Sequence, residues 1–113
     1  CATIYTPPAG EAIVVTSASY GVGNGSAGTL VQTMLTDPTC SYWYDTAWTD
    51  KGLETQFHPF PIGIPMPVVT AEAVSVSSGS SAITITGYLI PAGQLPAAPP
   101  ATKIPAAALH PTR

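Results

Sequence analysis

Short runs of alternating hydrophobic and polar residues, separated by glycines and prolines, occur along residues 1–93. In the run TLVQTMLT at 29–36, Val31, Thr33 and Leu35 fall on one face of an extended chain. Helix signals are scarce, because thirteen prolines and ten glycines interrupt most windows of helical length. The pattern therefore predicts β-strands, at 3–6, 11–20, 29–36, 42–44, 54–60, 68–77 and 81–90.

Turn-forming residues set the limits of these strands. The glycine-rich segment 21–28 is predicted to be a loop, and 37–40 and 50–52 are predicted to be turns. Prolines at 59, 61, 65 and 67 leave few backbone donors for a ladder, so this part of the chain is expected to be an edge strand or an extended connection.

Seven or eight short strands favour an all-β, antiparallel β-sandwich, of jelly-roll or immunoglobulin-like type. In its last strand, Ile83, Ile85 and Leu89 share the face that we expect to point to the core. No tryptophan lies midway between the two cysteines, which argues against a true immunoglobulin domain. We expect a sandwich domain at 1–93 and an extended proline- and alanine-rich arm at 94–113.

Charge is sparse, with three Lys or Arg and six Asp or Glu in 113 residues and a net charge of −3. Such a surface is neutral and rich in hydroxyl groups. Without a basic cluster, nucleic acid and anionic membrane surfaces are poor partners. No apolar run reaches the roughly 18 residues that a membrane-spanning helix needs, so no membrane insertion is expected.

Two cysteines, Cys1 and Cys40, suit one disulfide in an oxidising compartment. The turn at 37–40 places Cys40 just past a strand end, within reach of the start of the chain. The alternative is that Cys1 is lipidated, which would leave Cys40 unpaired. The first residue is not Met, which fits either a processed mature form or a trimmed numbering. We expect a secreted protein, extracellular or at the cell surface.

Three segments, CATIYTPPAGEAIVVTSAS, DPTC and SAITITGYLIPAG, together resemble a group of small secreted actinobacterial β-sandwich proteins. Those proteins begin with a cysteine and a Pro-Ala-Gly turn and end in a Gly-Tyr-Leu-x-Pro strand. The resemblance implies a secreted sandwich with a Cys1–Cys40 bond, and it implies no activity. The arm after Gly93 departs from the pattern.

Catalytic chemistry has few candidates in this chain. Its two histidines, His58 and His110, lie in no nucleophile, metalloprotease or phosphate-binding motif. Four acids fall close together, but they lack the spacing of a calcium loop, and a small domain offers no deep cleft for a glycosidase pair. We therefore predict no catalytic residue, no metal site and no cofactor, and we expect these acids on connecting loops: Asp37, Asp45, Asp50 and Glu54.

Aromatic residues are densest between 42 and 48. Packing in the core or in a subunit interface is one interpretation, since Tyr and Trp are enriched there. The other is a sugar-stacking surface, which would make the protein a secreted carbohydrate-binding module. The residues concerned are Tyr42, Trp43, Tyr44 and Trp48.

The arm at 94–113 cannot add a central strand or a long helix, because its prolines favour an extended chain. Such a segment becomes ordered only when another surface holds it. We expect a second copy of the chain to supply that surface, with Ile104 and Leu109 as anchors. The expected receiver is Ile62, Ile64 and Met66. The resulting hypothesis is a non-enzymatic structural subunit of an extracellular homo-oligomer or filament.

Overall fold

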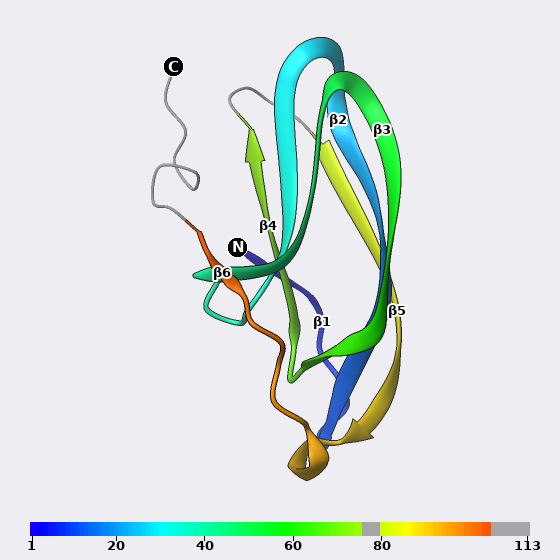
Figure 1. The fold of residues 1–113 in the computed structure, drawn as a ribbon, viewed down its shortest axis with the longest axis vertical. Helices are drawn as coiled ribbons and strands as arrows, with labels where there is room; N and C mark the ends of the chain where they lie inside the picture. The colour runs from blue at the N-terminus through cyan, green and yellow to red at the C-terminus, as the bar shows by residue number, and fades with distance from the viewer. Residues whose placement is uncertain (76–79, 105–113) are drawn as a thin grey trace.

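The structure, a computed structural model, describes residues 1–75 and 80–104, and these are all-β apart from one 3-10 turn. Six strands form an antiparallel sheet (Figure 1), which confirms the predicted fold class. The elements are β1 (Ala2–Tyr5), β2 (Glu11–Thr36), β3 (Tyr42–Met66), β4 (Val69–Ser75), β5 (Ser80–Pro91), η1 (Ala92–Gln94) and β6 (Thr102–Lys103).

Strands β2 and β3 are unusually long, and together they form a hairpin that bends over at its middle. Residues 11–23 of β2 lie between β5 and residues 53–66 of β3, and this group is the first layer. Residues 31–36 of β2 lie between β4 and residues 43–49 of β3, and with β1 and β6 they form the second layer. Figure 1 shows both strands turning over at the same end of the molecule. One continuous sheet thus becomes a sandwich.

The bend is glycine-dependent, and it corrects two of our predictions. Segments 21–28 and 50–52, expected as a loop and a turn, remain within β2 and β3. Gly23 and Gly52 both have positive φ, at 149° and 98°. A Cβ atom on Gly23 would lie 1.7 Å from the carbonyl oxygen of Gly52. Glycines that predicted an interruption instead allow two strands to cross closely while they turn.

The core lies between the two layers. Its larger cluster of buried side chains consists of Ile13, Val15, Leu35, Ile64, Met66 and Val69. Ile83 and Ile85 of β5 pack against the core as predicted. The prediction is wrong for Leu89, which is 42% exposed. Its ladder partner in β2, Ile13, is buried. Among the described strands, β5 pairs only with β2 and is an edge, so no further strand of this set covers Leu89.

Residues 53–66 of β3 form the other edge of the first layer, since β2 is their only ladder partner in the part of the chain that the structure describes. This confirms the edge position that the prolines predicted. Pro59, Pro61 and Pro65 fit here because one side of an edge strand needs no N–H donors.

A disulfide joins Cys1 to Cys40, with 6.0 Å between their Cα atoms. It ties the start of the chain to the turn before β3. The lipidation alternative is wrong for this fold, because the Sγ atom of Cys1 is already bonded. The bond suits an oxidising environment such as the extracellular space. Within the described residues, no helix is long and apolar enough to cross a membrane.

Candidate functional site

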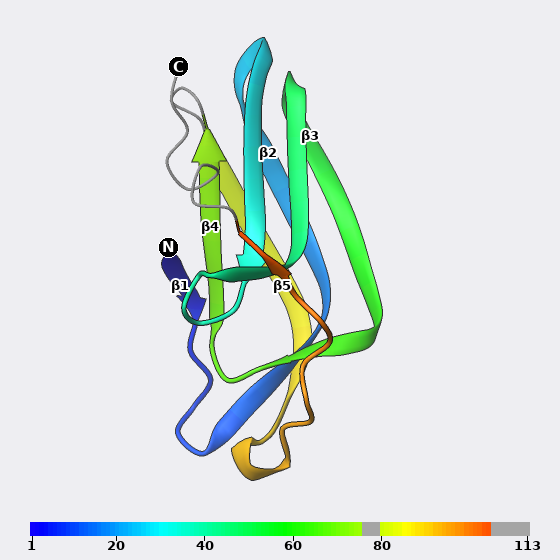
Figure 2. The same ribbon diagram turned by 60° about the vertical axis from the view of Figure 1, so that its left-hand side comes forward.

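The C-terminal arm, described here for residues 94–104, docks on its own domain. After η1 it runs along the side of the sandwich to β6 (Figure 2). Thr102 and Lys103 pair with Trp43 and Tyr42 of β3. Ile104 donates its N–H to the carbonyl oxygen of Ser41 at 2.9 Å, and its side chain is 4% exposed. The arm is therefore held by a two-residue ladder and one buried anchor.

An apolar groove of about 480 Å³ lies between the arm and the edge of β3. Tyr44 and Phe60 line it from the two layers, and Pro96, Pro99 and Pro100 line it from the arm. Ile62 stands at this groove with 98% of its surface exposed. Ile62 therefore offers apolar surface beside the groove that another side chain or molecule could cover.

Only part of the predicted arm and receiver is found in the positions expected. Ile104 is a buried anchor, but within its own chain; Leu109 lies outside the described residues. Of the receiver residues, Ile62 is exposed, whereas Ile64 and Met66 are buried in the core; Ile62 and Ile64 both line the arm groove. Between Ile62 and the buried residues the ladder is irregular: Ile64 pairs with Val15 and Pro59 pairs with Ser17, so residues 60–63 form a bulge, in which Gly63 has a φ of 83°.

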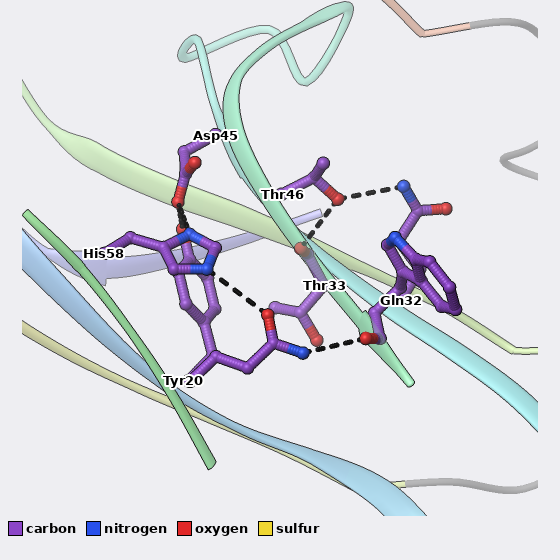
Figure 3. Close-up of polar contacts among 8 residues, drawn as sticks. Tyr20, Gln32, Thr33, Asp45, Thr46 and His58 are labelled. Carbon is purple, nitrogen blue, oxygen red and sulfur yellow. Dashed lines mark hydrogen bonds and ion pairs between the residues drawn. The ribbon is translucent and has the colours of Figure 1, made fainter. Parts of the chain in front are cut away.

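A polar cluster links the two halves of β3 (Figure 3). Asp45, in the second layer, accepts hydrogen bonds from the hydroxyl of Tyr20 and from Nδ1 of His58 in the first layer, both at 2.7 Å. Tyr20 is fully buried, and its ring lies 5.1 Å from that of His58. Burial, then the hydrogen bond to Asp45 and its charge, raises the pKa of Tyr20 far above its ordinary value. The phenol therefore stays a donor, and we call this cluster the β3 clasp.

The clasp extends through His58 to the surface. Nε2 of His58 lies 3.2 Å from Oε1 of Gln56, and Nε2 of Gln56 donates to the carbonyl oxygen of Trp48 at 2.8 Å. Both ring nitrogens of His58 thus face oxygen atoms. These polar contacts connect buried Tyr20 with the backbone of Trp48 through Asp45, His58 and Gln56.

Trp48 borders a polar hollow of about 350 Å³ at the bend of β3. Its indole is 56% exposed. The remaining lining is Thr49, Asp50, Lys51, Glu54 and Gln56. We call this site the Trp48 hollow.

The four aromatic residues predicted as a cluster do not form one surface. Tyr42 and Trp43 pair with β6, Tyr44 lines the arm groove, and Trp48 lies alone at the hollow.

The four acids also lie at different places in the fold. Asp37 closes the turn before β3 by accepting the N–H groups of Ser41 and Tyr42.

The expectation that the four acids lie on connecting loops is wrong for Asp45, which is half-buried and hydrogen-bonded within the sandwich. Asp50 and Glu54 lie within β3 and line the hollow. Sequence reasoning missed Tyr20 and Gln56, since neither belongs to a motif and both acquire their roles from the bend.

Neither the sequence nor the fold matches a protein-family model, a curated protein or a solved structure.

Proposed function

We propose that the protein is a non-enzymatic structural subunit of an extracellular homo-oligomer or filament, assembled when the arm of one copy docks on the next. One observation supports this above all. The arm is attached to the sandwich by a small docking surface that is separate from the main core, namely the pairing of β6 with β3 and the burial of Ile104.

The energy that holds the arm is modest, and exchange between copies would restore it. Burying an isoleucine contributes about 1.5–3 kcal/mol, and each ladder hydrogen bond adds about 1 kcal/mol. Between η1 and β6, residues 96–100 are exposed. Their prolines keep that segment extended, and it can lead the arm to a neighbour without loss of core packing. The same contacts then form between copies, as in domain swapping.

Two further features favour assembly once arms have exchanged. Ile62, almost fully exposed beside the groove, offers apolar area that a neighbouring copy would bury. The low charge of the chain also reduces repulsion between packed subunits.

A cross-strand disulfide tests the proposal directly. Tyr42 and Lys103 are paired residues in β3 and β6, and such pairs lie within the Cα range that disulfides span. Tyr42→Cys and Lys103→Cys proteins, prepared separately, are mixed and oxidised under assembly conditions. If arms exchange, a covalent heterodimer appears on a non-reducing gel.

Two controls complete the test. Each single-cysteine variant, oxidised alone, measures how much disulfide-linked dimer forms without arm exchange. The double variant, oxidised as a monomer before assembly, should remain monomeric in light scattering. Ile104→Asp should also reduce assembly while leaving the sandwich folded by circular dichroism. Normal assembly of the pre-oxidised double variant would contradict arm exchange.

A further inference from the structure

The Trp48 hollow has a composition unlike the rest of the exposed surface described above. It presents one half-exposed indole, and every other residue lining it carries a hydroxyl, carboxylate, ammonium or amide group. Tryptophan in a sandwich of this size would normally be covered, because a buried indole contributes more to stability than an exposed one. Its exposure beside hydrogen-bonding groups is a feature to be explained.

The hollow is held in shape before any ligand binds. The side-chain amide of Gln56 is fixed at both ends, by the carbonyl of Trp48 and by His58. Oγ1 of Thr49, which is 1% exposed, accepts the N–H of Lys51 at 3.1 Å and so fixes the start of the bend. A site whose parts are already immobilised loses little conformational entropy on binding.

The strand beside the hollow is tied down as well. Trp48 is paired with Gln32 of β2, and Nε2 of Gln32 donates to Oγ1 of Thr46 at 2.9 Å (Figure 3). Oγ1 of Thr46 in turn donates to the carbonyl oxygen of Thr33 at 3.2 Å. The backbone that carries the indole is therefore supported on both sides.

The lining selects a ligand class. The carboxylates of Asp50 and Glu54 outnumber the ammonium of Lys51, so the lining opposes an anionic ligand, while Lys51 partly offsets their negative charge. The groups include both donors and acceptors, which matches hydroxyl groups that are donors and acceptors themselves. The indole needs a flat partner with an apolar face. A pyranose ring satisfies all these requirements, with its C–H face on the indole and its hydroxyls toward the polar rim.

We propose that the Trp48 hollow binds a neutral saccharide, with one sugar ring stacked on Trp48 and hydrogen-bonded to Asp50 and Glu54. Gln56 is a positioning residue, because its side-chain amide is already engaged by Trp48 and His58. The proposal does not depend on arm exchange, since none of the arm residues that the structure describes, 94–104, lines the hollow.

The test uses the full chain and neutral hexasaccharides of glucose, mannose, xylose and N-acetylglucosamine, with hexagalacturonate as the acidic comparison. Calorimetry measures affinity, and tryptophan fluorescence reports stacking. We expect at least one neutral hexasaccharide to bind, and Trp48→Ala to weaken it at least about tenfold. Tyr88→Ala is the matched control, because Tyr88 is equally exposed, at 56%, but lies outside the hollow.

The polar half of the site is tested by Asp50→Asn and Glu54→Gln, each expected to weaken binding several-fold, by roughly the strength of one hydrogen bond. Trp48→Phe should retain part of the affinity, because it keeps an aromatic face. The proposal is overturned if no neutral hexasaccharide binds, if Trp48→Ala and Tyr88→Ala behave alike, or if hexagalacturonate binds more tightly than every neutral sugar.

Discussion

Removal of the Asp45 carboxylate should open the β3 clasp and destabilise the whole sandwich. In Asp45→Ala, the hydroxyl of Tyr20 loses the acceptor that lies 2.7 Å away, and His58 loses its partner on Nδ1. Tyr20 is 0% exposed in the folded protein, so its hydroxyl depends on Asp45 as its acceptor. Of the hydrogen bonds described above between the two halves of β3, the one from Gln56 to Trp48 would remain.

The size of the effect follows from the bonds. A hydrogen bond to a charged group contributes about 1.5–3 kcal/mol, and an unsatisfied buried hydroxyl costs about 1–3 kcal/mol. We expect Asp45→Ala to lower the free energy of unfolding by about 3 kcal/mol and Tyr20→Phe to lower it by about 1–1.5 kcal/mol. The double variant should lose less than the sum by about 1 kcal/mol or more, because the second change removes an already unsatisfied hydroxyl.

The assay is urea unfolding followed by circular dichroism, with the disulfide intact, for the wild type, both single variants and the double variant. Asp50→Ala is the matched control, an exposed acid on the same strand, and should change stability by no more than about 0.5 kcal/mol. If the two losses add within about 0.5 kcal/mol, the Tyr20–Asp45 bond does not couple the layers and the clasp is refuted.

Three other changes test the fold. Burial opposes ionisation of Asp37, but hydrogen bonds from Thr39, Tyr42 and Ser41 outweigh it and hold the pKa of Asp37 below its ordinary 3.8. The ionised carboxylate therefore stabilises the fold above pH 3.8, and this stabilisation is lost as the pH falls below that value. We expect Asp37→Asn to flatten the decline of the urea midpoint between about pH 6 and 2. Gly23→Ala should lose more than about 2 kcal/mol through a clash across the bend, whereas Gly93→Ala, with open space around it, should be near neutral in thermal melts. Replacing both cysteines by Ser removes a cross-link between positions 1 and 40 and should lower unfolding free energy by about 3–4 kcal/mol.

The alternation of side chains predicted most strands and the edge position of 53–66, because both depend on local spacing and on the missing donors of proline. Spacing and turn chemistry also favoured the disulfide. The bend could not be predicted in the same way. A glycine-rich run such as 21–28 has the composition of a loop whether or not a partner strand crosses it, and only the simultaneous turn of β3 at Gly52 keeps it within the ladder.

The residues of the clasp and the hollow could not be predicted from the sequence either, because the bend brings them together. Residues 45 and 58, or 48 and 56, meet only because β3 folds back on itself. The expected receiver was divided in the same way: Ile62 is exposed, and the bulge at 60–63, with a positive φ at Gly63, precedes the buried Ile64 and Met66. Tertiary geometry decided these roles, so a pattern read along the chain could not assign them.

The two proposed binding surfaces lie at different parts of β3, the arm ladder at Tyr42 and Trp43 and the saccharide hollow at the bend. Arm exchange would therefore leave the hollow open and repeat it along the assembly. Binding at a surface coated with the bound hexasaccharide should then be tighter for the assembled wild type than for the Ile104→Asp monomer, by about 10²-fold or more, because later contacts become intramolecular. Affinity per site in solution calorimetry should be unchanged. Equal retention of both proteins on the coated surface would show that assembly and saccharide binding do not act together.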